Sequence, residues 1–130
     1  MSAIVHWTEV TLRPTDRDEV GHVNNVIFAT LVAAGRVDFI AARLEPHAAP
    51  GTDFWLARIE IDYQRQLHYP GSIRIGTGVE RLGRSSITLG HELRTGDDVA
   101  ARGRSVLVHV EPRSGKSREL PDALRRAFPG

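Results

Sequence analysis

The chain of 130 residues contains no cysteine. A disulfide framework, a thiol nucleophile and a cysteine-based zinc site are therefore all excluded. The sequence also has no large excess of positive or negative charge, because 17 basic and 16 acidic residues leave a formal net charge of +1. A nucleic-acid-binding protein is expected to carry a clustered basic surface, whereas here the basic residues are interspersed with acids. The balance argues against nucleic acid as a partner.

A secretory signal and a continuous membrane span are also missing from the sequence. Residues 1–7 have neither the basic start nor the continuous apolar stretch of a signal peptide. Arg36 and Asp38 interrupt the longest apolar segment before it reaches the roughly twenty residues that a bilayer span needs. The six histidines are scattered without the spacing of metal ligands. We therefore expect a cytoplasmic protein with no membrane partner and no metal.

What the sequence does contain is enough apolar material for one core. A length of 130 residues and a hydrophobic content of 41% are typical of a single soluble domain, expected over residues 1–130. The longest helical segment is predicted from about Val26 to Arg43, with apolar residues pointing in every direction around the helical wheel. Such a helix is normally wrapped by the rest of its domain. Gly35 costs this helix about 1 kcal/mol relative to Ala, which predicts close approach of a sheet or a partner helix.

Alternation of apolar and polar residues predicts five strands. The strongest pattern runs from Trp55 to Leu67, with Arg65 on its apolar row, and a short final helix is expected to begin at Pro121. The other strands are expected at about residues 4–12, 73–79, 87–93 and 99–110. This order predicts an α+β fold in which an antiparallel sheet carries the long helix on one face. Because one five-stranded sheet covers only part of such a helix, we expect a homo-oligomer, either a dimer or a tetramer.

Polar residues are concentrated directly before the long helix, in residues 16–25. They include Asp18, His22, Asn24 and Asn25. The first turn of a helix leaves backbone N–H groups unpaired and carries the positive end of the helix dipole, so it can hold an anion or polarise a carbonyl. A simple N-cap and a simple glycine turn would also explain single members of this set. The convergence of acids, amides and a histidine at one helix end favours a functional site.

The motif Asp-x-Asp-x-x-Gly-His-Val-Asn-Asn at residues 16–25 resembles that of the hot-dog-fold acyl-CoA thioesterases of the 4-hydroxybenzoyl-CoA thioesterase type. Arg36 matches an arginine that is typical of the helix in that family. Further similar segments are residues 59–63, 81–86, 103–106 and 120–124. The resemblance implies a sheet wrapped around a central helix and hydrolysis of acyl-CoA thioesters. It implies no cofactor beyond the coenzyme A of the substrate.

The resemblance also implies roles for single residues. Asp18 matches the catalytic carboxylate, which attacks the thioester carbonyl or activates water. The backbone N–H near Asn25 would polarise the carbonyl oxygen, and His22 would contact the substrate or orient water. Asn24 is assigned to substrate binding. Family members bind the phosphates of the coenzyme near the subunit edge, which implies contacts from Arg65, Arg84, Ser85 and Ser86.

The sequence departs from the family at Ala34, where many relatives carry an acid two positions before the helix arginine. Two other functions stay open on the same fold. One is a hot-dog enoyl-CoA hydratase or dehydratase, which would add water to an enoyl-CoA without releasing a thiol. The other is a non-catalytic module that binds acyl-CoA or an acyl-carrier protein. The length and type of the acyl group are not specified by the sequence.

Overall fold

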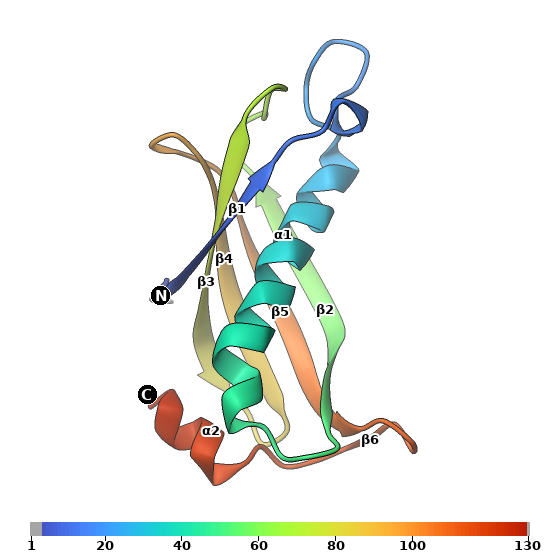
Figure 1. The fold of residues 1–130 in the computed structure, drawn as a ribbon, viewed down its shortest axis with the longest axis vertical. Coiled ribbons are helices and arrows are strands. Elements are labelled where there is room, and N and C mark those ends of the chain that lie inside the picture. Colours follow the sequence, from blue (N-terminus) through green and yellow to red (C-terminus); the bar gives the residue numbers. More distant parts are fainter. Residues whose placement is uncertain (1–3, 130) are drawn as a thin grey trace.

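A curled antiparallel sheet lies against one long helix in the computed structural model, which describes residues 4–129 (Figure 1). The order across the sheet is β1-β3-β4-β5-β2, and the short strand β6 pairs with β5. The strands are β1 (His6–Thr11), β2 (Asp53–Tyr63), β3 (Ser72–Leu82), β4 (Ser86–Thr95), β5 (Asp98–Glu111) and β6 (Lys116–Ser117). The five long strands confirm the predicted α+β arrangement, and the two-residue β6 is an addition to it.

The long helix differs from its prediction at both ends. α1 (Asn25–Phe39) begins one residue earlier, and its α-helical part ends before Arg43. The chain continues without a break through a π-helical turn, η2 (Ile40–Leu44), and a 3₁₀ turn, η3 (Glu45–His47). The other helical elements are η1 (Pro14–Asp16) and α2 (Asp122–Ala127), for which Pro121 is the N-cap and not the first helical residue.

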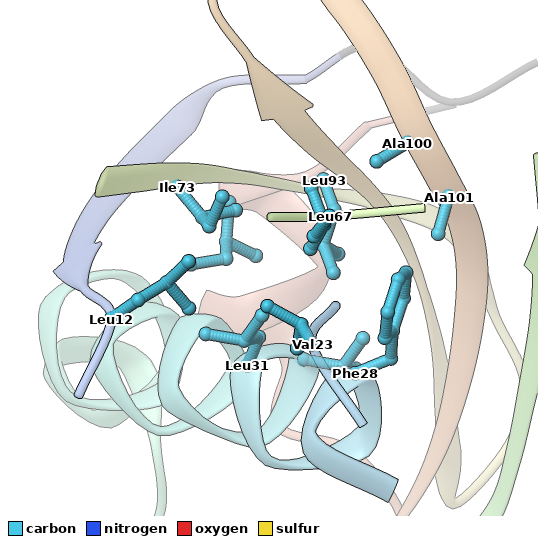
Figure 2. Close-up of a cluster of buried hydrophobic side chains, with 11 residues drawn as sticks. Leu12, Val23, Phe28, Leu31, Leu67, Ile73, Leu93, Ala100 and Ala101 are labelled. Atoms are coloured by element: carbon cyan, nitrogen blue, oxygen red, sulfur yellow. The ribbon is translucent and has the colours of Figure 1, made fainter. Parts of the chain in front are cut away.

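One face of α1 packs against the sheet. Its buried residues are Phe28, Leu31, Val32, Gly35 and Phe39. Figure 2 shows Phe28 and Leu31 pointing toward side chains from the strands and from the segment that carries Leu67. A Cβ on Gly35 would overlap the side chain of Ile75 and lie 3.3 Å from Thr77 Oγ1. The close approach predicted for this glycine is therefore made by β3.

The opposite face of α1 is uncovered in the single chain. Val26 is 70% exposed and Val37 is 63% exposed. Residues 25–47 are long and apolar enough to cross a membrane by length and composition alone, with a mean hydropathy of 1.5. This is weak evidence for a span, because the core helix of a globular domain passes the same test. The contacts of α1 with the sheet are those of such a core helix.

Strand β2 departs from the predicted alternation at two points. The register with β5 shifts between Leu56 and Arg58, and the strand ends at Tyr63 and does not reach Leu67. Arg65 therefore lies beyond the strand, where its backbone N–H donates to the carbonyl of Ala100. A bulge of this kind reverses which residues face the helix.

A polar cluster lies under the middle of α1, within the otherwise apolar inner layer. His91 Nδ1 lies 3.2 Å from Thr77 Oγ1, and His91 Nε2 lies 2.8 Å from Ser105 Oγ. The Arg36 guanidinium donates to the same serine at 3.4 Å. Burial, together with the positive charge of Arg36, lowers the pKa of His91 to about 4. The imidazole is therefore neutral at pH 7.

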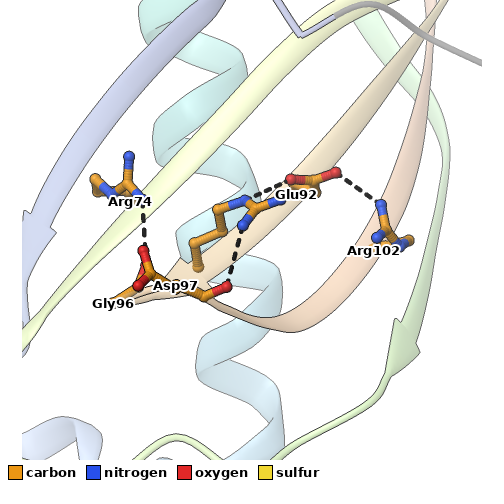
Figure 3. Close-up of polar contacts among 6 residues, drawn as sticks. Arg74, Glu92, Gly96, Asp97 and Arg102 are labelled. Carbon is orange, nitrogen blue, oxygen red and sulfur yellow. Dashed lines mark hydrogen bonds and ion pairs between the residues drawn. The ribbon is translucent and has the colours of Figure 1, made fainter.

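Ion pairs lie on the outer face of the sheet, and Figure 3 shows those of Glu92. Glu92 accepts from the guanidinium of Arg94 and from that of Arg102, both at 2.7 Å. Glu80 accepts from Arg104 at 2.7 Å. The two faces of the sheet thus separate an apolar inner layer from a charged outer layer.

Candidate functional site

The loop before α1 is closed by a buried carboxylate. Asp16 is only 4% exposed and accepts from the backbone N–H of Arg13 at 2.7 Å and from its guanidinium at 3.0 Å. These hydrogen bonds from Arg13 lower the pKa of Asp16. The Asp16 carbonyl also accepts from the N–H of Asn24 at 3.0 Å, and so ties the start of the loop to its end. Asp16 holds the loop together and is not available for chemistry.

Asp18 has the opposite environment. Its side chain is exposed, and Oδ1 accepts from the N–H groups of Val20 and His22, both at 3.0 Å. The Asp18 N–H in turn donates to the His22 carbonyl at 2.7 Å. Its second oxygen, Oδ2, accepts no hydrogen bond from the described residues. The carboxylate is therefore fixed through one oxygen and open to a ligand through the other.

The first turn of α1 follows directly. Asn24 is the N-cap, and its side-chain oxygen accepts from the N–H of Val26 at 3.0 Å. The N–H of Asn25, the first helical residue, finds no acceptor within residues 4–129. The Asn25 carbonyl accepts from the hydroxyl of Tyr63 at 3.1 Å, which ties the helix start to the end of β2. A free N–H at the positive end of a helix dipole can polarise a carbonyl oxygen.

A second histidine that sequence analysis missed lies beside the first. His22 and His68 form an isolated bridge between their backbones, and their rings meet edge to face with centroids 4.8 Å apart. The next residue, Tyr69, lies under the guanidinium of Arg17, 5.3 Å from the ring centroid. No local sequence signal marks residues 68 and 69, because they follow the strand pattern and lie more than forty positions after the motif.

The structure brings only part of the predicted site together. Asp18, His22, Asn24 and Asn25 share one loop, as the hydrogen bonds above show. Arg65 lies two residues after Tyr63 and therefore at the same end of the molecule; its guanidinium is 3.9 Å from Asp98.

The turn formed by residues 83–85 lies at the other end of α1. Figure 1 shows this turn near α2, far from the start of the helix. The Arg84 carbonyl accepts from the N–H of Leu120, and the Ser85 carbonyl accepts from the N–H of His109. Arg84, Ser85 and Ser86 are thus not brought to Asp18 within one chain.

Sequence analysis also missed a cation beside that turn. Arg118 is exposed, and its backbone N–H donates to the carbonyl of His109. The segment from Arg118 to Leu120 therefore runs between β5 and Arg84. A signal was present, because Arg113, Lys116 and Arg118 are closely spaced in the sequence.

Comparison with known proteins identifies the family to which this chain belongs. Residues 12–128 match the model of the thioesterase-like superfamily. The chain belongs to this superfamily. A predicted thioesterase from Bacillus stearothermophilus is similar over 94% of the chain and 92% of its own length, with 30% identity and a TM-score of 0.83. A thioesterase from Thermus thermophilus, solved with coenzyme A and Zn, is 29% identical over 98% of this chain and 100% of its own, with a TM-score of 0.82.

A putative thioesterase from Pseudomonas aeruginosa has the same fold, with a TM-score of 0.85, 24% identity and coverage of 96% and 98%. No curated protein matches the chain. These similarities confirm the predicted hot-dog fold and the thioesterase family. The narrower 4-hydroxybenzoyl-CoA type stays a prediction. Within residues 4–129, no three histidine or acidic side chains are grouped so that they could hold a metal ion.

Proposed function

We propose that this protein hydrolyses acyl-CoA thioesters, with Asp18 as the catalytic carboxylate. One observation carries the proposal: Asp18 is fixed through Oδ1 and open at Oδ2, in the loop that leads into α1. Membership of the thioesterase-like superfamily and the coenzyme A bound by the Thermus thermophilus thioesterase support the same substrate class.

The chemistry follows from the groups at the helix start. The thioester carbonyl oxygen accepts a hydrogen bond from the Asn25 N–H, which stabilises the negative charge that develops as the carbonyl is attacked. Asp18 either attacks the carbonyl carbon or removes a proton from the attacking water. In either route the carbon–sulfur bond breaks and the sulfur leaves as the thiolate of the coenzyme. Where Asp18 attacks, an acyl–aspartyl anhydride forms, and a water molecule then hydrolyses it and regenerates Asp18. The water supplies the oxygen of the carboxylic acid product and the proton that converts the thiolate into the coenzyme thiol. A thiolate leaves readily, so the site needs no strong general acid.

The coenzyme half of the site is proposed to come from a second chain. β2 pairs only with β5 among the described strands, and its free edge is eleven residues long. Exposed apolar side chains line it: Trp55 (44%), Leu56 (44%), Ile59 (37%) and Tyr63 (52%). A long apolar edge of this kind is a template for pairing with another strand. A symmetric partner that pairs through its own β2 would cover it.

Antiparallel pairing of two β2 strands would also combine the two ends of the molecule. Tyr63, at the end of β2, contacts the start of α1. Asp53, at the beginning of β2, pairs with Val110, and the neighbouring His109 bonds to Ser85. The end of one strand would therefore lie beside the beginning of its partner. Such a pairing would bring Arg84, Ser85, Ser86 and Arg118 of one chain near Asp18 of the other, where they would bind the coenzyme phosphates.

A thiol-release screen over short, long and aromatic acyl-CoAs tests the proposal. Replacement Asp18→Asn should lower kcat by at least about a hundredfold on whichever thioester the wild type cleaves, the usual scale for loss of a general base. Glu19→Gln removes a neighbouring exposed carboxylate and should leave turnover unchanged. Equal turnover by wild type and Asp18→Asn would falsify the catalytic role. Binding of acyl-CoA without thiol release from any substrate would instead indicate the binding module.

A further inference from the structure

A depression in the surface lies away from Asp18, at the far end of the helical segment. It has a volume of about 760 Å³ and is bordered by the start of β1, the end of β3, residue Arg43 and the end of α2. Its apolar residues are Val5, Val79, Leu82, Ala127, Phe128 and Pro129, and its basic residues are Arg43, Arg81 and Arg125. It therefore combines an apolar floor with a cationic rim.

Two of the three guanidinium groups are fixed in place. Arg125 donates to the carbonyls of Gly83 and Arg84 at 2.8 and 3.1 Å. Arg43 donates to the carbonyl of Val5 at 3.2 Å. Carbonyl groups hold these side chains without neutralising their charge.

The positive charge of the rim is not balanced locally. Within residues 4–129, none of Arg43, Arg81 and Arg125 lies in an ion pair with an acid. Glu80 is the one acid among the lining residues, and its carboxylate is bonded to Arg104 at 2.7 Å. The net charge of the whole chain is only +1, so three unpaired cations around one depression are a local concentration. Guanidinium groups recognise carboxylates and phosphates through paired hydrogen bonds.

The apolar floor of the depression adjoins the buried apolar cluster that contains Phe39 and Leu44. Val79, Leu82 and Phe128 are partly buried against the cluster that includes Phe39 and Leu44. The Phe128 ring lies 6.2 Å from that of Phe39, centroid to centroid. An alkyl chain placed on this floor would remove both its own surface and that of the protein from water.

We propose that this depression binds a single-chain anionic amphiphile: an alkyl chain on Val79, Leu82 and Phe128, with a carboxylate or phosphate head between Arg43, Arg81 and Arg125. The site is separate from Asp18, because Arg43 lies after the C-terminal end of α1 and Asp18 lies before its start. It adjoins the turn that carries Arg84, since Arg125 donates to the Arg84 carbonyl, but none of the proposed coenzyme contacts is among its lining residues. It is also on the β1 and β3 side of the sheet, opposite the free edge of β2. The proposal does not depend on the catalytic role of Asp18.

Calorimetric titration with decanoate and with decyl phosphate tests the site and distinguishes the two head groups. At least one of them should bind the wild type, and affinity should rise by roughly threefold for each methylene added between six and ten carbons. Acetate, inorganic phosphate and decanol should bind far more weakly, because each lacks either the chain or the charge. Equal affinity for inorganic phosphate and decyl phosphate would contradict the role of the apolar floor.

The double variant Arg43→Gln/Arg81→Gln should weaken binding of the amphiphile by at least about tenfold, the scale of two lost charged hydrogen bonds. Arg74→Gln/Arg102→Gln removes the same charge from exposed positions that do not line the depression and should leave the affinity within about twofold. Unchanged affinity in the first variant would place the amphiphile at another site, such as the one at Asp18, and overturn the proposal. Equal weakening in both variants, or no binding of either amphiphile to the wild type, would also overturn it.

Discussion

The two ends of α1 carry the two halves of the proposed acyl-CoA site. At its start lie a carboxylate with an open oxygen, an unpaired N–H and two histidine rings. Beyond its other end lies the turn of Arg84 to Ser86, beside the exposed Arg118. The first end has the groups that we propose to react, and the second has cations suited to phosphates. We infer that the functional unit is a pair of chains and that neither end is sufficient alone.

The two edges of the sheet differ in a way that supports this pairing. β1 has only six residues, and Asp38 of α1 ties it to the helix by accepting from His6 at 2.8 Å and from Thr8 at 2.6 Å. The hydrogen bond from Thr8, followed by that from His6, lowers the pKa of Asp38. β2 is nearly twice as long and exposes apolar side chains at its free edge. One edge is thus short and tied to α1, and the other is long and lined by exposed apolar side chains.

The largest effect is expected from blocking the open edge. In Leu56→Lys/Ile59→Lys, two charges on the edge strand would oppose pairing with a second copy. Light scattering at micromolar concentration should report at least twice 14.4 kDa for the wild type and about 14.4 kDa for the variant. Thiol release should fall by more than about tenfold, since each site loses its coenzyme contacts.

Thr11→Lys places one charge on the opposite edge and is the matched control. It should leave both the mass and the activity unchanged, because β1 is not proposed to pair. A wild type that is monomeric and fully active would separate catalysis from dimerisation and remove the basis for a shared site.

A smaller effect is expected at the cationic end. Arg84→Gln should raise KM by roughly five- to tenfold and leave kcat nearly unchanged, because a phosphate contact far from the reacting carbonyl acts on ground-state and transition-state binding equally. Steady-state kinetics with an acyl-CoA measure both constants. Arg74→Gln, in β3, is the control for loss of one exposed arginine. A fall in kcat with constant KM would contradict the phosphate role.

The smallest effect is expected midway between the two ends, at His91, and it concerns the stability of the fold. The pKa of this histidine falls from 6.5 to about 4 on folding, so the unfolded chain binds the extra proton between these values. The contribution of the neutral imidazole to the free energy of unfolding is fully present above about pH 6.5 and is lost as the pH falls toward 4. Urea unfolding should show a loss of about 2 kcal/mol between pH 7 and pH 5.

His91→Asn removes the titrating group and keeps a polar partner for Thr77 and Ser105. The variant should be less stable at pH 7, but its stability should change much less between pH 7 and pH 5. A pH dependence equal to that of the wild type would assign the titration to another group.

The fold could be predicted from the sequence to a large extent because the patterns that define it are local. Alternation marked all five long strands, and Gly35 in the apolar helix indicated close approach of a sheet or a partner helix. The bulge at residues 56–58 could not be predicted, because one extra residue in a strand leaves no local mark. The strand also ends at Tyr63, which leaves Arg65 outside it.

The candidate site could be predicted only where its residues are contiguous. Residues 16–25 carry Asp18, His22, Asn24 and Asn25 in one loop, and the motif marked all four. The difference between the environments of Asp16 and Asp18 could not be predicted, because it depends on hydrogen bonds that form only in the folded loop. His68 and Arg118 are brought in by tertiary pairing, which depends on the path of the whole sheet.

Mixing two inactive or weakened chains tests most directly whether one site is built from two subunits. Asp18→Asn and Arg84→Gln proteins are unfolded together, refolded in equal amounts and assayed for thiol release at a substrate concentration below KM. In half of the dimers, one site combines the intact Asp18 of one chain with the intact Arg84 of the other. Activity should then reach about a quarter of the wild-type value, several times the mean of the two parents. A mixture whose activity equals the mean of its parents would show that Asp18 and Arg84 act within the same chain or not together at all.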